Sequence, residues 1–297
     1  MRLIKKICVE NDYAGSNWDF EKTTKYILDL DGRNVEAGYF EHYKDGTLVK
    51  SVLELPQSYG CPSKCGFCAT SGIKNFYIFT ADILMQLFEY LYTENTLKDH
   101  KYVLLTMTGM GDIFYNYDNV ERFLLGLKDY TNVSVTLSSV LWNAELLRKV
   151  ELLSSQIRIR NVQLTYITDS DERRSEIIPI YRQKEYLLDE VIAFMKESHQ
   201  AYYRFNYILM KGINDDQQDF KNFARKMEDI KDKVIIRISK LNETEASKRN
   251  HLYPAEIEVM EKFHQFLQKE GMNSYVFYAK KNDHMNCGQL ITENKEE

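Results

Sequence analysis

The feature that most constrains this chain is a loop with three closely spaced cysteines, Cys61, Cys65 and Cys68. Their C-x3-C-x2-C spacing lets one loop present three thiolates to one centre, and thiolates are soft ligands suited to zinc or to iron–sulfur clusters. A structural zinc site needs a fourth ligand at a familiar spacing, but the next cysteine is Cys287 and His42 is isolated upstream. A disulfide framework fits poorly, because 297 residues contain only five cysteines. We therefore predict that these three cysteines hold a [4Fe-4S] cluster.

A cluster with three protein ligands leaves one iron open, and the amino and carboxylate groups of S-adenosylmethionine (SAM) can chelate such an iron. The spacing of the cysteines, with the aromatic Phe67 just before Cys68, resembles the signature of the radical SAM superfamily. The resemblance implies two cofactors, a [4Fe-4S] cluster and SAM, and an enzyme that cleaves SAM to a 5′-deoxyadenosyl radical. It also implies a reducing electron donor such as flavodoxin or ferredoxin.

Composition sets the broad class of the protein. With 44% hydrophobic residues, the chain can bury a substantial core. No apolar run approaches the ~20 residues that span a bilayer, and no secretory apolar segment follows Met1. We therefore expect a cytoplasmic protein without a membrane partner, in a compartment where thiols stay reduced. The net charge of −5 does not supply the basic stripe that is usual in nucleic-acid-binding proteins, although a local basic face could exist.

Short apolar strands alternate with amphipathic helices along most of the chain, which is typical of a parallel sheet covered by helices. The expected strands are 35–40, 48–55, 102–107, 133–137, 162–166, 203–210, 234–238 and 275–278. The expected helices follow Thr80, include 120–127, and cover 143–153, 185–195, 216–227 and 254–267, the last beginning at Pro254.

This alternation predicts an α/β fold, a partial (β/α)6-type barrel, with active residues at the carboxyl ends of the strands. The turn signal at 44–46 joins the first two expected strands into a short N-terminal β-hairpin. We expect an N-terminal extension with this hairpin over 1–55, a barrel domain over 56–290 and a flexible tail over 291–297.

Several separated motifs resemble one class within the superfamily, the RlmN/Cfr radical SAM methyltransferases, which methylate an adenine ring carbon in RNA. The motifs are the cysteine loop at 59–72, Gly-Met-Gly-Asp at 109–112, the serine-bearing strand end at 135–139, the segment 171–180, Ile-Asn-Asp at 213–215 and Asn-Cys-Gly-Gln-Leu at 286–290. The cysteine loop alone identifies the superfamily, whereas its combination with the last motif is specific to the methylating class.

By this resemblance, Cys287 is a methyl carrier. In the class, one SAM methylates this cysteine, the radical from a second SAM takes a hydrogen from that methyl group, and the resulting carbon radical adds to the ring. Such radical chemistry suits an sp² adenine carbon, which is a poor nucleophile. The alternative interpretation of Cys287 is a buried free cysteine, a common core residue.

The resemblance also implies which residues contact SAM. The corresponding positions are Gly111, Asp112, Ser138, Thr165 and Asn242. Asp112 stands where the class has a glutamate for the SAM ammonium group, and it is one methylene shorter. Its alternative role is a helix N-cap, and the alternative for Ser138 and Asn242 is that of ordinary residues after strand ends. Glu36 stands where the class has a general base, although a lone glutamate on a hairpin often faces solvent.

Three departures from the class pattern affect the expected mechanism. Glu54 stands where the class has a second cysteine that resolves the covalent adduct, Ile167 replaces a histidine and Ile113 replaces a proline. Glu54 could accept a proton but cannot form a disulfide. Only about 34 residues precede Glu36, fewer than an ordinary independent domain needs, so we expect the helical N-terminal RNA-binding domain of the class to be lacking.

Three functions remain open at this point. The first is a methyl or methylene transferase that uses Cys287 on an adenine-like base, in RNA or in a smaller nucleotide or metabolite. The second is a radical SAM enzyme that abstracts hydrogen directly from a small-molecule substrate, and the third is a non-catalytic cluster-containing binding protein. Basic residues near the barrel mouth could meet phosphates, or could simply form a solvated face: Arg173, Arg174, Arg182, Lys280 and Lys281.

Overall fold

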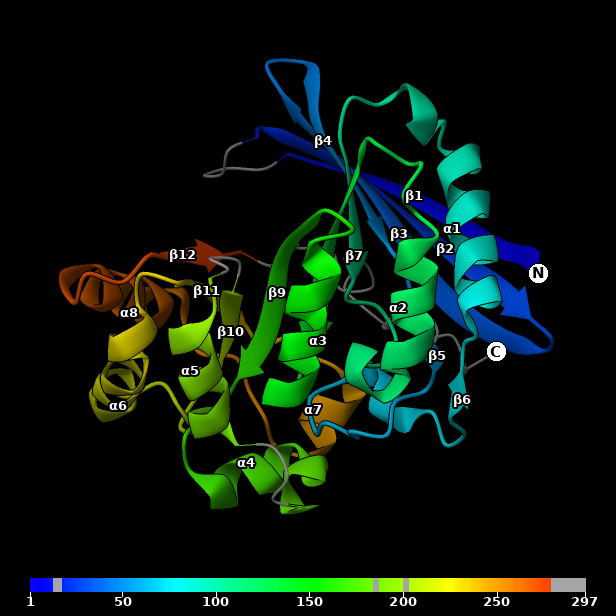
Figure 1. The fold of residues 1–297 in the computed structure, drawn as a ribbon. Coiled ribbons are helices and arrows are strands. Elements are labelled where there is room, and N and C mark those ends of the chain that lie inside the picture. Colours follow the sequence, from blue (N-terminus) through cyan, green and yellow to red (C-terminus); the bar gives the residue numbers. More distant parts are fainter. Residues whose placement is uncertain (13–17, 184–186, 200–202, 279–297) are drawn as a thin grey trace.

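A computed structural model of the chain describes residues 1–12, 18–183, 187–199 and 203–278 (Figure 1). Within these residues, ten strands form one sheet in the order β1-β2-β3-β4-β7-β8-β9-β10-β11-β12. The strands of this sheet are β1 (Arg2–Asp12), β2 (Phe20–Leu30), β3 (Arg33–Lys44), β4 (Thr47–Glu54), β7 (Val103–Met107), β8 (Val133–Ser139), β9 (Ile159–Tyr166), β10 (Tyr203–Leu209), β11 (Val234–Lys240) and β12 (Ser274–Phe277). A separate two-stranded ladder pairs β5 (Ser58–Tyr59) with β6 (Tyr77–Ile78).

The helices are connections between the strands. They are α1 (Ala81–Glu94), α2 (Tyr117–Leu125), α3 (Ala144–Ser154), α4 (Asp171–Ile177), α5 (Leu188–Glu197), α6 (Gln217–Met227), α7 (Glu245–Arg249) and α8 (Ile257–Lys269), with short 3₁₀ turns that include η3 (Ile113–Asn116). Local signals explain several starts: the side chain of Thr80 caps α1, and Asn143 caps α3.

From β4 to β12 every neighbouring pair in the large sheet is parallel. Each strand from β4 to β11 is followed by at least one helix before the next strand of the sheet, which makes six β/α units and confirms the predicted partial (β/α)6 barrel. In Figure 1 the helices lie along one side of the curved sheet. The parallel strands therefore direct their carboxyl ends to one edge, where the cysteine loop follows β4.

The N-terminal part adds antiparallel strands to the same sheet. β3 and β4 form the predicted hairpin, and Asp45 and Gly46 in its turn have φ values of 50° and 71°. The extension is larger than this hairpin, because β1 and β2 pair antiparallel with each other and β2 pairs with β3. Strands β1 to β3 thus continue the barrel sheet in antiparallel fashion beyond β4.

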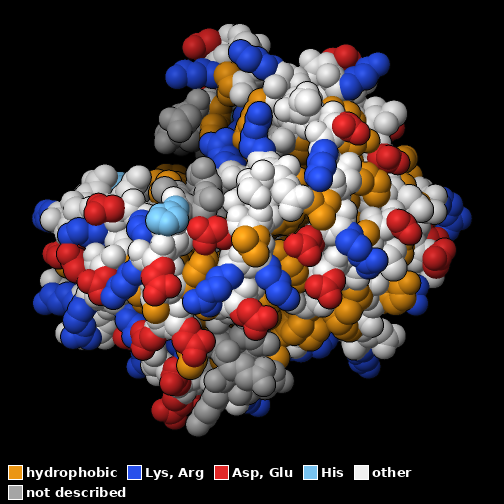
Figure 2. All heavy atoms as spheres, viewed as in Figure 1, with side chains coloured by type: hydrophobic (Ala, Val, Ile, Leu, Met, Phe, Trp, Pro, Cys, Tyr) orange, Lys and Arg blue, Asp and Glu red, His pale blue; other side chains and the backbone are white. Residues whose placement is uncertain are grey.

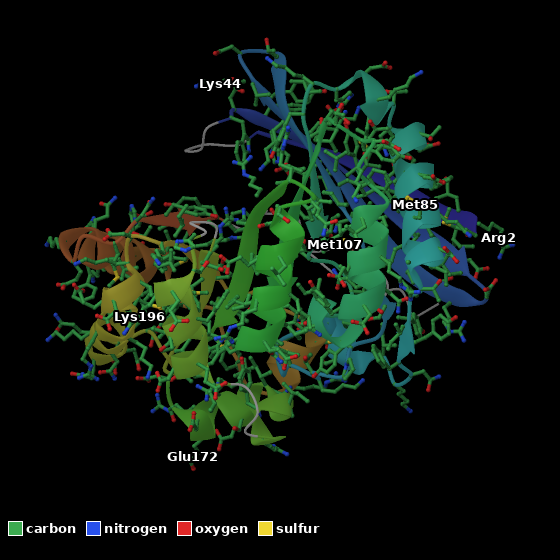
Figure 3. The ribbon with its side chains drawn as sticks, in the orientation of Figure 1. Arg2, Lys44, Met85, Met107, Glu172 and Lys196 are labelled. Carbon is green, nitrogen blue, oxygen red and sulfur yellow. The ribbon has the colours of Figure 1, made fainter. Side chains whose placement is uncertain are left out.

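The two faces of the sheet differ in chemistry. The outer face is apolar and packs on the helices; for example, the ring of Tyr207 lies 5.1 Å from that of Phe223 on α6 and 4.7 Å from that of Phe263 on α8. Met107 is fully buried, and Figure 3 shows it between β7 and the helices. Charged side chains such as those of Arg2, Glu172 and Lys196 lie at the periphery in the same view.

The opposite face, here called the inner face, is polar. Its side chains alternate along each strand with those of the apolar core. It includes Thr106, Ser134, Thr136, Ser138, Asn161, Gln163, Thr165, Arg204, Asn206, Arg237 and Ser239. A polar inner face suits a barrel that encloses a polar ligand rather than one that is filled by side chains alone.

Two further points concern the predicted elements. The last helix begins at Ile257 and not at Pro254, which instead forms an isolated bridge with Met210. In this bridge the Lys211 N–H donates to the Tyr253 carbonyl at 2.9 Å, so no backbone N–H is required from Pro254. None of the described helices is long and apolar enough to cross a membrane.

Candidate active site

The cysteine loop leaves β4 at the carboxyl edge of the sheet and is fixed by hydrogen bonds from distant segments. The backbone N–H of Gly66 donates to the Ile177 carbonyl at 2.7 Å, and the Asn250 side chain donates to the Gly66 carbonyl at 2.9 Å. Thr244 Oγ1 donates to the Phe67 carbonyl at 3.0 Å. The ends of α4 and α7 therefore hold the loop from outside.

Tight backbone turns shape the same loop. Gly60 has a φ of 74°, and a Cβ there would lie 2.4 Å from the Asn75 carbonyl oxygen. Lys64 also has a positive φ, of 49°, and its ammonium group donates to the carbonyls of Ser71 and Ile73. These contacts satisfy the carbonyl groups of Ser71 and Ile73 and fix the shape of the loop that carries the three cysteines.

The three cysteines are free thiols in a low-dielectric environment. Burial raises the pKa of Cys61 to about 12, and the nearby charges of Asp112 and Cys68 contribute in the same direction. The pKa of Cys65 is well above the ordinary value, again first through burial and then through Cys68 and Cys61. Three thiolates here would repel one another, so a positively charged group is needed to hold them in the ligating form.

This arrangement fits a four-iron cluster better than a single ion. Within the described part of the chain, no three His, Cys, Asp or Glu side chains converge on one metal position. In a cubane cluster each thiolate binds its own iron, so the sulfur atoms need not meet at one point. Cys61, Cys65 and Cys68 are the residues that would hold the cluster.

Asp112 lies beside the cysteines but is firmly held by the protein itself. Its carboxylate accepts hydrogen bonds from Ser139 Oγ at 2.8 and 2.9 Å, from Phe114 N at 3.0 Å and from Val140 N at 2.7 Å. Burial raises its pKa to about 6, and these hydrogen bonds partly oppose that rise. The carboxylate caps η3, which agrees with the alternative role of Asp112 as an N-cap, and it ties this turn to the end of β8.

Gly111 precedes Asp112 in a conformation that suits glycine. Its φ is 97°, and a Cβ would lie 2.2 Å from Ser58 Oγ. Next to it, Gln57 N donates to the Met110 carbonyl at 2.7 Å, which binds this segment to the start of the cysteine loop. The structure thus brings the Gly-Met-Gly-Asp segment and the cysteine loop side by side.

The other predicted SAM contacts lie at the carboxyl ends of strands or just after them. Ser138 lies on the inner face of β8, where its Oγ accepts from Gln163 Nε2 at 3.3 Å, and Thr165 lies at the same end of β9. Asn242 follows β11. At the end of β8, the sequence pointed to Ser138 and not to Ser139, whose hydroxyl holds Asp112. The two adjacent serines carry no sequence signal that distinguishes them.

Glu36 and Glu54 are joined by a buried lysine. Lys25 Nζ lies 3.0 Å from Glu36 Oε1 and 2.9 Å from Glu54 Oε1, and the three side chains are 1%, 2% and 13% exposed. Thr108 Oγ1 also donates to Glu54 Oε2 at 3.1 Å. Glu36 is therefore buried and does not face solvent, contrary to the usual expectation for a hairpin glutamate.

Sequence reasoning did not identify Lys25. The strand that carries it has buried polar residues on alternate positions, Glu21, Thr23 and Lys25, so it lacks the apolar alternation that marks a strand. From the sequence alone, a lysine in such a segment is expected to be solvent-exposed unless its carboxylate partners are known.

Of the basic residues that could meet phosphates, Arg174 does not lie on an open face. It is 6% exposed, its guanidinium group lies 4.4 Å from the Trp142 ring and 4.7 Å from the Tyr181 ring, and it donates to the Thr168 carbonyl at 3.2 Å. Arg173 is exposed and donates to the Ile213 carbonyl at 2.8 Å. Cys287, Lys280 and Lys281 lie outside the described residues.

A partial barrel of six β/α units, with a three-cysteine loop after its first parallel strand, defines the class of SAM-cleaving iron–sulfur enzymes. Residues 55–224 match the radical SAM superfamily. The chain belongs to this superfamily, and it is a methyltransferase-like enzyme.

Its relatives include RNA methyltransferases. The chain is 28% identical over 282 residues to the probable dual-specificity RNA methyltransferase RlmN of Pseudothermotoga lettingae, a match that covers 92% of this chain and 77% of the relative. It is 31% identical over 215 residues to the probable RlmN of Dictyoglomus turgidum, covering 68% of this chain and 58% of that relative. The resemblance to the RlmN class is thus confirmed.

Among solved structures, a radical SAM methyltransferase from Sphaerobacter thermophilus has the same fold. The TM-score is 0.75 at 19% sequence identity, over 97% of this chain and 80% of the other. The similarity therefore extends through the N-terminal strands β1 to β4 as well as the barrel.

Proposed function

We propose that this protein is a radical SAM methyl or methylene transferase that modifies an sp² carbon of an adenine-like base, with Cys287 as the methyl carrier. The observation that carries this proposal is the joint presence of the cysteine loop, braced at the carboxyl edge of the barrel, and the Asn-Cys-Gly-Gln-Leu motif at 286–290. The names of the relatives support RNA or nucleotide chemistry.

In this proposal each group of residues has a role that follows from its position in the barrel. Cys61, Cys65 and Cys68 hold a [4Fe-4S] cluster, which supplies an electron for the cleavage of SAM when both are bound. Gly111, Asp112, Ser138, Thr165 and Asn242 surround the SAM position, and Asp112 offers its remaining carboxylate lone pairs while it caps η3. The polar inner face excludes apolar ligands and orients a polar base.

Glu36 and Glu54 supply proton acceptors to the same side of the site. Lys25 holds both carboxylates in place, and Thr108 orients the second oxygen of Glu54. A base that is methylated on carbon must lose the ring proton it carried there, so a positioned carboxylate is the residue type this step requires. Glu36 is our candidate for this role, and Glu54 is the candidate for a second proton transfer.

The test is mass spectrometry of the purified, cluster-loaded protein after incubation with SAM and a reductant. We expect one methyl group on the peptide that contains Cys287, and none in Cys287→Ala. An unmodified Cys287 thiol in protein that does cleave SAM would exclude the carrier role. A flavodoxin or ferredoxin serves as the expected electron donor in the cytoplasm.

The second candidate function is direct hydrogen abstraction from a small-molecule substrate. The residue that favours it is Glu54, which stands where the class has its resolving cysteine. Glu54 forms an ion pair with Lys25 and accepts a hydrogen bond from Thr108. Deuterium that moves from labelled substrate into 5′-deoxyadenosine would support this reaction, whereas deuterium that moves from the labelled SAM methyl group would support the carrier mechanism.

A further inference from the structure

Four basic side chains meet on the inner face, three of them near the amino-terminal ends of barrel strands and the fourth midway along β11. They are Lys50 on β4, Arg160 on β9, Arg204 on β10 and Arg237 on β11, and we call them the cation cluster. Arg204 and Arg237 alternate with buried apolar residues whose side chains face the helices, so both lie on the inner face. A register shift between β8 and β9 falls at Arg160.

The register shift allows Arg160 to reach the inner face. Its guanidinium group donates to Tyr102 Oη at 2.8 Å, and the same oxygen accepts from Ser134 Oγ at 2.6 Å. Ser134 belongs to the polar side of β8 that also carries Thr136 and Ser138. Four strands therefore direct positive charge into the same region of the inner face.

The cation cluster has an excess of positive charge. Among the residues that the structure describes, no carboxylate forms an ion pair with Lys50, Arg160 or Arg204. The carboxylate that faces Lys50 is Glu21, which is already 3.1 Å from His42 Nδ1 and accepts from Thr23 at 2.7 Å.

The neighbouring positive charges affect the pKa of Lys50. The pKa of Lys50 is lowered to about 8, first by burial and then by the charges of Arg160, Arg204 and Arg237, while Glu21 opposes this shift. Like charges that are kept close and partly out of water destabilise a protein unless an anion compensates them. The cation cluster thus has the positive charge that an anion-binding site requires.

Aromatic rings line the cluster on the same side. The guanidinium carbon of Arg237 lies 3.7 Å from the Phe277 ring, that of Arg204 lies 5.7 Å from the Tyr275 ring, and Lys50 Nζ lies 5.6 Å from the Trp18 ring. Figure 2 shows lysine and arginine side chains along the N-terminal strands, beside the hollow that separates these strands from the part of the molecule formed by β10 to β12. These three cations therefore pack against aromatic rings.

Polar side chains connect the cation cluster to the SAM position. Arg237 donates to Gln163 Oε1 at 3.3 Å, and Gln163 Nε2 donates to Ser138 Oγ at 3.3 Å. Between them, Thr136 Oγ1 and Asn161 Oδ1 are buried, and no described group hydrogen-bonds either atom. Arg204 Nε is buried in the same way. Buried polar atoms without partners mark places where a polar ligand can bind.

The distance along the barrel suits a ligand of moderate length. Lys50 precedes Glu54 by four residues on one strand, which corresponds to roughly 13 Å at about 3.3 Å per residue. A ligand whose charged end is bound beside Lys50 would therefore present its other end to Glu54. A free nucleotide has this construction, with phosphate at one end and a base at the other.

We propose that the cation cluster of Lys50, Arg160, Arg204 and Arg237 binds the phosphate of a free nucleotide substrate whose base extends along the inner face toward Ser138 and the cysteine loop. This inference rests on the proposed function and names its substrate class. Arginine and lysine are the residues that recognise phosphate, arginine through paired N–H donors. The acidic net charge of −5 agrees with a small ligand rather than a long RNA.

The test measures binding and not turnover, with cluster-loaded full-length protein in isothermal titration calorimetry. The ligands are pyrophosphate, AMP, adenosine and a short adenine-containing RNA. We expect AMP and pyrophosphate to bind, adenosine to bind at least tenfold more weakly than AMP, and Arg204→Gln to weaken AMP binding at least tenfold. Arg225→Gln, on the outer surface of α6, is the matched control and should bind AMP as the unmodified protein does.

Lys50→Gln gives a second variant in case Arg204→Gln does not fold, and we expect the same loss of AMP binding. Equal affinity for AMP in Arg204→Gln, Lys50→Gln and Arg225→Gln would overturn the inference. Preference for the RNA over AMP, with no effect of these variants, would also overturn it. Methylation of Cys287, measured on the same unmodified preparation, tests the proposed function separately, because that step requires SAM and no nucleotide.

Discussion

Lys25 and Glu54 form an ion pair across an intervening strand, with 2.9 Å between Lys25 Nζ and Glu54 Oε1. In the register of the sheet, Lys25 on β2 is opposite Gly38 on β3, which is opposite Glu54 on β4. Gly38 has no side chain, so the lysine can extend over it. A Cβ at Gly38 would lie 2.9 Å from the Phe40 ring and 3.4 Å from Glu54 Oε1.

This ion pair predicts a large effect of Lys25→Met. The substitution leaves two carboxylates buried without their shared cation, so we expect the free energy of unfolding to fall by about 3–5 kcal/mol. Urea denaturation monitored by circular dichroism measures it. The triple variant Lys25→Met with Glu36→Gln and Glu54→Gln removes the charges together and should recover most of the loss. A single variant as stable as the unmodified protein would contradict the role of Lys25.

The cysteine loop predicts a specific loss of iron. In Cys65→Ala we expect reconstituted protein to contain far less than the roughly four iron atoms of a complete cluster and to lose SAM cleavage, because the remaining two thiolates hold the cluster poorly. Iron analysis and the visible absorption spectrum measure this. Cys8→Ser is the control, since Cys8 is exposed on β1, away from the loop. Equal iron content in both variants would exclude the loop as the cluster site.

Ser138 and Ser139 are neighbours with different expected roles. The Ser139 hydroxyl donates to the buried Asp112 carboxylate, so Ser139→Ala should lower the free energy of unfolding by about 1–3 kcal/mol. Ser138 lies on the inner face, so Ser138→Ala should leave stability nearly unchanged and weaken SAM binding about fivefold, the equivalent of one hydrogen bond. Denaturation and SAM titration of both variants separate these roles, and identical behaviour would refute the assignment.

The barrel could be predicted from the sequence because its strands are short apolar runs and amphipathic helices lie between them. The cysteine loop could also be predicted, since three ligands within eight residues need no tertiary information. The strands β1 and β2 were not predicted, because polar residues such as Glu21 and Lys25 occupy buried inner positions where the usual pattern is apolar.

The contacts that define the rest of the site could not be predicted from one sequence. Lys25, Glu36 and Glu54 meet only through the pairing of three strands, and the partner of Lys25 depends on the absence of a side chain at Gly38. The cation cluster likewise depends on a register shift at Arg160 that has no marker in the sequence. Cys287 lies outside the described residues, so its role remains a prediction.

Lys50 predicts a pH dependence of anion binding to the cation cluster. Its pKa of about 8 lies below the ordinary value of 10.5 because of burial and the three arginines. Raising the pH from 7 to 9 therefore converts it from mostly charged to mostly neutral, and if binding requires the charged form, affinity falls by roughly tenfold. Arginine side chains in general remain protonated over this range.

Sulfate is the suitable probe, because it remains a dianion from pH 7 to pH 9 and its own protonation does not contribute. Calorimetric titration at both pH values should show the tenfold loss for the unmodified protein. Lys50→Arg keeps its charge at pH 9, so its sulfate affinity should change much less between the two values. Equal sulfate affinity of the unmodified protein at pH 7 and pH 9 would show that Lys50 does not take part in binding, and the cation cluster would then consist of the three arginines alone.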